Sequence, residues 1–355
     1  MSIRKRPPLR PHEIDLLSAV DRSLPAEAAI DAWRRWAAAV DIDEIDAGTF
    51  ELLPRLQRRI EELGDSVAGD HRISGTYRLS WARNQPLLIA AADLARKLRD
   101  AEIQTTALCG TWIGFDGASD RGGRPLREAA LAVHPADAEA AIAVLDGPRW
   151  TADPPDPQRR LGQVSSIKFH RRDSDRIQVR LWYRVPTQIL GMQRLMARSA
   201  RVIDDELAVS VPSRDDRLIE LCMEGMSGQP QRRLAWIADA QELLADHAAV
   251  SWPELLTNAG ERRIAAHIRS ALIHLNSISS GTVPEHVICE LDGIGSTLSE
   301  RAAMWGRARD SGPLRAFALG CDQHRRYRHL GPQDPLGRPR LLDSLRQRHT
   351  FIDLV

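Results

Sequence analysis

A glycine turn in the middle third of the chain has the composition of an anion-binding turn. Gly110 and Thr111 follow the short β-branched run IQTTALC at residues 103–109. Backbone N–H groups in a turn of this kind can face a phosphate. A tight connection between a strand and a helix has the same composition. Both interpretations of Gly110 and Thr111 therefore stay open.

A single carboxylate begins the next buried run. Glu128 lies in residues 126–133, LREAALAV, where it is either a metal ligand or base, or a polar residue of an edge strand. Alternate residues of a strand share one face, and the next position on the face of Glu128 is Ala130. The Ala129-Ala130 pair favours the edge-strand interpretation.

The order of helical and strand patterns along the chain predicts an α+β fold, in which a small mixed sheet between two helical regions positions these residues. Apolar residues recur at helical spacing up to residue 100, with a helix stop at Gly64. Residues 103–112, 126–133, 164–172 and 176–185 read as strands, the last two joined by a hairpin turn. Residues 135–145 read as a helix and the proline-rich residues 151–160 as a hinge.

Helical spacing returns beyond residue 213, where Ser213 and Ser251 have the positions of helix N-caps. The pattern predicts five segments, which are a disordered lead at 1–11, an N-terminal helical region at 12–100, the α/β core at 101–212, a C-terminal helical domain at 213–310 and a tail of unknown order at 311–355.

Composition limits the partners. The 49 basic and 48 acidic side chains balance, so charge gives no support for binding long nucleic acid. No apolar run is long enough to span a membrane and the N-terminus lacks a signal-peptide core, so we expect a cytoplasmic protein that binds no membrane. Four dispersed cysteines predict buried thiols, not a zinc site or disulfides. The sequence does not indicate the oligomeric state.

The order of these segments resembles the bacterial uncharacterised nucleotidyltransferase family, a branch of the polymerase-β-like superfamily, over residues 12–276. The likeness rests on short motifs in a fixed order: LCGT at 108–111, the turn FDGASDRGG at 115–123, Arg124-Pro125, Glu224-Gly225 and RLAWIAD at 233–239. From the residues themselves, we expect Arg124 to pack or form a salt bridge beneath the turn, and Asp239 to cap or bridge near a buried Trp236.

The resemblance implies a catalytic centre in which aspartates on adjacent strands hold divalent metals against nucleotide phosphates. Glu128, Ala130 and Arg180 stand at the three carboxylate positions of the family pattern, and Cys109 stands where a lysine is expected. One carboxylate cannot hold a bridging Mg²⁺, so the sequence predicts no metal ligands. Arg180 either takes the electrostatic role of the metal and binds an anion, or is an outward-facing strand arginine.

Three hypotheses follow. The leading one is a non-catalytic binding or accessory protein with no certain cofactor, whose Gly110, Thr111 and Arg180 contact a nucleotide, peptide or protein partner. The resemblance also implies a role beside peptide natural-product genes. The alternative is an active nucleotidyltransferase that uses an NTP with Mg²⁺, with Glu128 as the catalytic carboxylate and further carboxylates recruited from Asp116, Asp120, Asp173 and Asp175. A metal-free enzyme with Arg180 as the transition-state clamp is the third.

Overall fold

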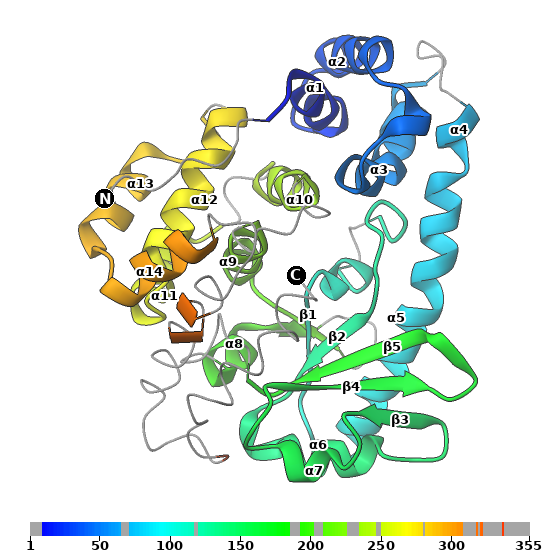
Figure 1. The fold of residues 1–355 in the computed structure, drawn as a ribbon, viewed down its shortest axis with the longest axis vertical. Helices are drawn as coiled ribbons and strands as arrows, with labels where there is room; N and C mark the ends of the chain where they lie inside the picture. Colours follow the sequence, from blue (N-terminus) through cyan, green and yellow to red (C-terminus); the bar gives the residue numbers. More distant parts are fainter. Residues whose placement is uncertain are drawn as a thin grey trace.

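The computed structural model describes residues 9–64, 71–116, 120–184, 192–201, 209–225, 234–245, 250–279 and 281–307, with residues 317, 318, 320, 321 and 336. The fold is α+β, as the sequence predicts: a mixed sheet lies between helices that precede it and helices that follow it (Figure 1). Residues 1–8 of the predicted disordered lead and most of the predicted tail lie outside the described residues. The division into five segments stays a prediction.

The first helices lie along the top and the right-hand side of the view in Figure 1. They are α1 Pro11–Val20, α2 Ala26–Ala39, the short 3₁₀ helix η1 Ile42–Glu44, α3 Ala47–Leu63, α4 His71–Ser74 and α5 Thr76–Asp100. The predicted helix stop is confirmed, because α3 ends at Leu63 and Gly64 follows with φ +76°. That left-handed backbone is one that glycine adopts without steric cost.

The sheet contains seven strands among the described residues, in the order β3-β4-β5-β2-β1-β7-β6. The central pair β1 and β2 is antiparallel, whereas β2 and β5 are parallel. The strands are β1 Thr106–Leu108, β2 Ala129–Ala132, β3 Trp150–Asp153, β4 Ser166–Arg171, β5 Ser174–Trp182, β6 Ala200–Arg201 and β7 Ser210–Val211.

The four predicted strands and the hairpin between β4 and β5 are confirmed. The predicted helix is confirmed as α6 Ala138–Leu145, which follows the 3₁₀ helix η4 Pro135–Asp137. The prediction of a hinge at residues 151–160 is wrong. Strand β3 pairs there with β4, and the short helix α7 Pro157–Arg160 follows it. The prolines end β3 after Asp153 and do not prevent it from pairing.

The two faces of the sheet are covered differently, because alternate residues point to opposite sides. Helix α5 packs against β2 and β5, and the residues Ala129, Leu131, Val179 and Leu181 join it in the main core. A smaller apolar cluster lies on the other face, where helix α8 Met192–Arg198 contributes Leu195 and Met196. Complete burial of a leucine stabilises a fold by roughly 2 kcal/mol, so the buried side chains stabilise the helix packing on both faces of the sheet.

The later helices pack beside the β1 side of the sheet (Figure 1). They are α9 Arg214–Gly225, α10 Ala235–Leu244, α11 Trp252–Glu261, α12 Ala265–Ile278, α13 Glu285–Ile294 and α14 Leu298–Arg307. Ser213 caps α9 as predicted, since its Oγ accepts a hydrogen bond from the Asp216 N–H at 3.4 Å. Ser251 has the N-cap position of α11, but its side chain makes no capping bond.

The cysteine prediction is only partly right. Cys222 is buried, Cys109 and Cys321 are half-buried, and Cys289 is exposed on α13. Among the described residues, no helix combines the length and the apolar composition that crossing a bilayer requires.

Candidate functional site

The residues singled out at the sheet lie in one row across four strands. Leu108 of β1 is opposite Ala130 of β2, Ala130 is beside Arg180 of β5, and Arg180 is opposite Lys168 of β4. Glu128 precedes β2 by one residue and shares the face of Ala130. The tertiary structure therefore brings together Glu128, Ala130 and Arg180, as the resemblance implies.

Glu128 and Arg180 are bonded to each other. Arg180 Nε donates to Glu128 Oε1 at 2.7 Å, and its Nη2 donates to Oε2 at 3.3 Å. Lys168 Nζ lies 3.5 Å from the same Oε2, while Arg180 Nη1 donates to Ser166 Oγ at 3.3 Å. A two-pronged pair of this kind is the strongest arrangement that a guanidinium and a carboxylate can make. Arg180 is only 3% exposed, so it is not the outward-facing arginine considered above.

The position of the missing aspartate is filled with hydrocarbon. Ala130 belongs to an apolar cluster with Leu108, Ala132, Trp182, Leu195 and Met196, and Cys109 packs against it. Helix α8 is held over this face, because Gln104 Nε2 donates to the Met196 carbonyl at 3.2 Å. Its last residue, Arg198, is bonded to Glu254 of α11 at 3.0 Å.

The metal that the resemblance implies does not fit this donor set. Glu128 is the one carboxylate of the row, and both of its oxygens already face cationic groups. Oxygen-coordinated Mg²⁺ is held by carboxylates and substrate phosphates, and two adjacent cations repel it. Within the described ranges, no three His, Cys, Asp or Glu side chains gather closely enough to share a metal ion.

The glycine turn leads into the 3₁₀ helix η3 Thr111–Gly114 and is used by the protein itself. Gly110 has φ +77°, and a Cβ atom there would lie 2.6 Å from Cζ of Arg124. Its N–H donates to Glu220 Oε1 of α9 at 3.0 Å, so a carboxylate occupies this anion-binding donor. Thr111 Oγ1 accepts the Ala130 N–H at 2.8 Å. The assignment of Gly110, Thr111, Glu128 and Arg180 to a binding or catalytic site stays a prediction.

Glu220 is a residue that sequence reasoning missed. Burial and the nearby Glu224 carboxylate raise its pKa to about 7, against the opposing effects of Arg124 and of the N–H donors of Gly110 and Trp112. A signal was present, since Glu220 and Glu224 recur four residues apart in the second half of α9, LIELCMEG, whose other residues are apolar or glycine. Only the tertiary fold shows that the first of them reaches the glycine turn.

Arg124 forms salt bridges, as predicted, and these join the glycine turn beside the sheet to the C-terminal helices. Its guanidinium is bonded to Glu224 of α9 at 3.1 Å and to Asp239 of α10 at 2.6 Å, all three side chains being buried. Burial alone would lower the pKa of Arg124, but the nearby carboxylates of Asp239, Glu224 and Glu220 together outweigh burial and raise it. Asn84 of α5 fixes the backbone here by donating to the carbonyls of Arg121 and Arg124, both at 2.7 Å.

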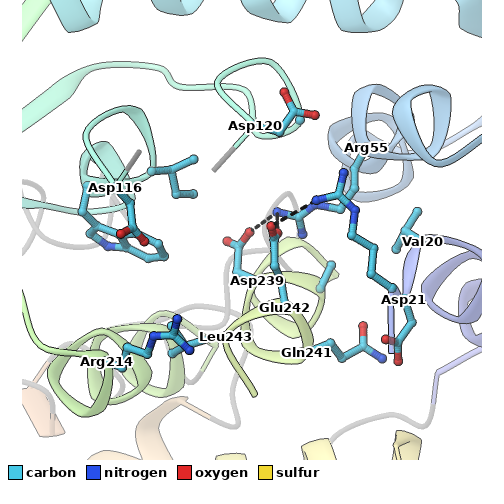
Figure 2. A pocket seen from close by; sticks show the side chains of 15 residues that line it. Val20, Asp21, Arg55, Asp116, Asp120, Arg214, Asp239, Gln241, Glu242 and Leu243 are labelled. Atoms are coloured by element: carbon cyan, nitrogen blue, oxygen red, sulfur yellow. Dashed lines mark hydrogen bonds and ion pairs between the residues drawn. The ribbon is translucent and has the colours of Figure 1, made fainter. Parts of the chain in front are cut away.

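The same Asp239 borders a cleft of about 160 Å³ (Figure 2). Arg55 of α3 bonds Asp239 at 2.6 Å and Glu242 at 3.2 Å, which ties the N-terminal helices to α10 along the cleft. The lining residues come from five parts of the chain, namely Val20, Asp21, Arg22, Arg55, Trp112, Ile113, Asp116, Asp120, Gly123, Arg214, Ala238, Asp239, Gln241, Glu242 and Leu243.

Two of the aspartates that a rearranged catalytic site would recruit line this cleft. Asp116 is paired with Arg217, whose guanidinium lies 4.9 Å from the centre of the Trp112 ring. Asp120 accepts the Tyr77 hydroxyl at 2.6 Å. Burial and this carboxylate raise the pKa of Tyr77 to about 12.

The other two recruited aspartates, Asp173 and Asp175, are in the β4–β5 hairpin and do not line the cleft. Asp173 is bonded to Arg171 at 2.6 Å. The four aspartates and Glu128 therefore do not face one shared cleft.

A family described as "Uncharacterised nucleotidyltransferase" matches residues 47–279, which run from the start of α3 to the end of α12. The matched region includes the whole sheet, the Gly110 turn and the Arg124 ion pairs. No curated protein and no solved structure matches the chain significantly.

Proposed function

We propose that the chain, which belongs to the uncharacterised nucleotidyltransferase family, is a binding or accessory protein that does not carry out metal-dependent nucleotidyl transfer. One observation carries the proposal. Glu128 is the one carboxylate at the three positions where the family pattern has aspartates, and it is bonded to Arg180 and close to Lys168. A metal ion at Glu128 would have to displace a buried guanidinium.

Two further features support the proposal. Leu195 and Met196 of α8 pack over Ala130, the position of the second carboxylate in the family pattern. Nucleotide phosphates could reach this face of the sheet only if α8 moved away from it. The Gly110 N–H, which a phosphate would need, is already bonded to the Glu220 carboxylate. Each part of a nucleotidyl-transfer centre is thus engaged with a partner inside the protein.

The experiment is a transfer assay on the full-length protein. Each of the four NTPs is supplied with Mg²⁺ or Mn²⁺ and with acceptors that carry a free hydroxyl, amine or phosphate group, and pyrophosphate release is measured against buffer alone. We expect no release above the buffer rate, because nucleotidyl transfer without a bound metal lacks the charge that stabilises the departing pyrophosphate.

Two matched variants make the assay decisive. Glu128→Ala removes the carboxylate of the sheet, and Glu51→Ala removes one that pairs with exposed Arg127 at 2.8 Å. The proposal is wrong if the wild-type chain releases pyrophosphate and Glu128→Ala alone abolishes that release. Release that survives Glu128→Ala but is lost in Asp116→Asn or Asp120→Asn would instead support a rearranged catalytic site.

A further inference from the structure

The cleft beside Asp239 has the size of a small organic ligand. Its volume of about 160 Å³ is close to that of a cavity of roughly 150 Å³ that accommodates benzene. A free amino acid or a dipeptide has this size, whereas a nucleoside triphosphate is far larger. The apolar part of the lining, with Trp112, Ile113 and Leu243, offers contact to hydrocarbon.

The charges of the lining favour a ligand that carries both signs. Three arginines and five carboxylates border the cleft, and the carboxylates are in excess. Asp116 and Asp120 come from the turn after β1, while Arg214 begins α9 (Figure 2). A triphosphate would meet more carboxylates than guanidinium groups, and a simple cation would meet Arg22, Arg55 and Arg214. A zwitterion can match both kinds of group.

Three lining side chains have polar atoms that lack a hydrogen-bond partner within the described part of the chain, and one of these atoms, Asp239 Oδ2, is neutralised by its ion pair with Arg124. Gln241 of α10 is only 5% exposed. Its Nε2 donates to Ser279 Oγ at 2.7 Å, whereas its Oε1 accepts no hydrogen bond. Arg55 Nη1 likewise makes no hydrogen bond, although Nη2 of the same side chain holds Asp239.

Leaving a buried polar atom unbonded costs on the order of 1–3 kcal/mol, so a ligand that satisfies it gains affinity. An N–H donor is needed beside Gln241 Oε1, and an acceptor is needed beside Arg55 Nη1. Ammonium and carboxylate groups supply that pair.

We propose that this cleft binds a small zwitterion of amino-acid or dipeptide size, an inference that rests on the proposed binding role and names its ligand class. The ammonium group is matched by the carboxylates of Asp116 and Asp120 and by Gln241 Oε1. The carboxylate is matched by Arg214 and Arg55, and the ligand side chain lies against Trp112.

The test uses the full-length protein without added metal. Free amino acids and glycyl dipeptides are screened one by one for a rise in the melting temperature, since a ligand that binds only the folded state stabilises it. The best probe is then titrated calorimetrically beside its N-acetyl and C-amide derivatives. We expect each derivative to bind at least about tenfold more weakly, because each loses one charge-assisted contact. A screen without any stabilising probe, or derivatives that bind as tightly as their parent, would overturn the inference.

Variants locate the site. Arg214→Gln and Asp116→Asn are expected to weaken binding of the best probe by about tenfold. Arg127→Gln is the matched control, because Arg127 is exposed and paired with Glu51 away from the cleft lining. Equal binding by all three variants would contradict the assignment to this cleft. A protein that neither transfers nucleotides nor binds any probe would refute this inference alone, whereas metal-dependent transfer would refute the proposed function.

Discussion

The sheet face under α8 and the cleft beside α10 both carry charged side chains, but they differ in what surrounds those charges. On the sheet, Glu128 and Arg180 are bonded to each other beside an apolar cluster. In the cleft, charges of both signs border a cavity, and Asp116 and Glu242 keep 32% and 39% of their side-chain surface exposed.

The difference lies in exposure, since Asp116 is paired with Arg217 much as Glu128 is paired with Arg180, but 32% of the Asp116 side chain is exposed against 10% of Glu128. The family pattern points to the sheet face, yet its charged groups there already satisfy one another. The cleft is lined in part by two other motifs of the resemblance, FDGASDRGG and RLAWIAD, to which no ligand role was assigned, yet its lining contains both exposed charges and unsatisfied polar atoms. Position in a motif and availability for binding are therefore independent properties in this chain.

Removing the link between the two regions should have the largest effect. Arg124→Met leaves the buried Glu224 and Asp239 without their shared cation. We expect the free energy of unfolding to fall by about 3–5 kcal/mol, measured by urea denaturation. Arg127→Met, at an exposed arginine three residues away, should change it by less than about 0.5 kcal/mol. A loss as small as that of the control would mean that the ion pairs do not hold the two regions together.

Breaking the ion pair of the sheet should have the next largest effect. Arg180→Met leaves Glu128 with Lys168 alone and should cost about 2–4 kcal/mol in the same measurement. The double variant Glu128→Leu/Arg180→Met removes both charges, so it should recover most of that loss. Additive losses from the two substitutions would show that the residues act independently, contrary to a structural pair.

Glu220, which reaches from α9 to the glycine turn, gives the smallest and most specific prediction. Its pKa is about 7 when folded, above the ordinary 4.5, so the folded chain retains a proton that the unfolded chain releases. The resulting stability is complete below pH 4.5 and is lost as the pH rises toward 7. Glu220→Gln removes this loss, since the amide oxygen can still accept both N–H groups. We therefore expect the free energy of unfolding of Glu220→Gln, taken relative to wild type, to be about 2 kcal/mol higher at pH 8 than at pH 5.

The control for this pH effect is Glu61→Gln on α3. Glu61 is about half exposed and hydrogen-bonded to Gln57 of its own helix. Its substitution should shift unfolding by a similar small amount at both pH values. Equal behaviour of the two variants between pH 5 and pH 8 would show that Glu220 keeps an ordinary pKa.

The fold was predictable where local pattern and tertiary pairing agree. The β4–β5 hairpin follows from two apolar runs around a polar turn, and the end of α3 follows from Gly64. Strand β3 was missed because Pro154, Pro155 and Pro157 follow it directly and make the segment read as a hinge. Its pairing with β4 comes from a partner outside the segment, which propensity does not include.

The sequence by itself determined the α+β class, the helical regions before and after the sheet, four of its strands, the family resemblance and the absence of aspartates at positions 130 and 180. These properties depend on residue types and short spacings, which a single chain displays directly. Only the tertiary structure decided that Glu128 is bonded to Arg180 and that Glu220 reaches Gly110. It also decided that side chains as far apart in the sequence as Val20 and Leu243 border one cleft. The physical reason is that a charge is available to a ligand or is already neutralised according to neighbours far away along the chain.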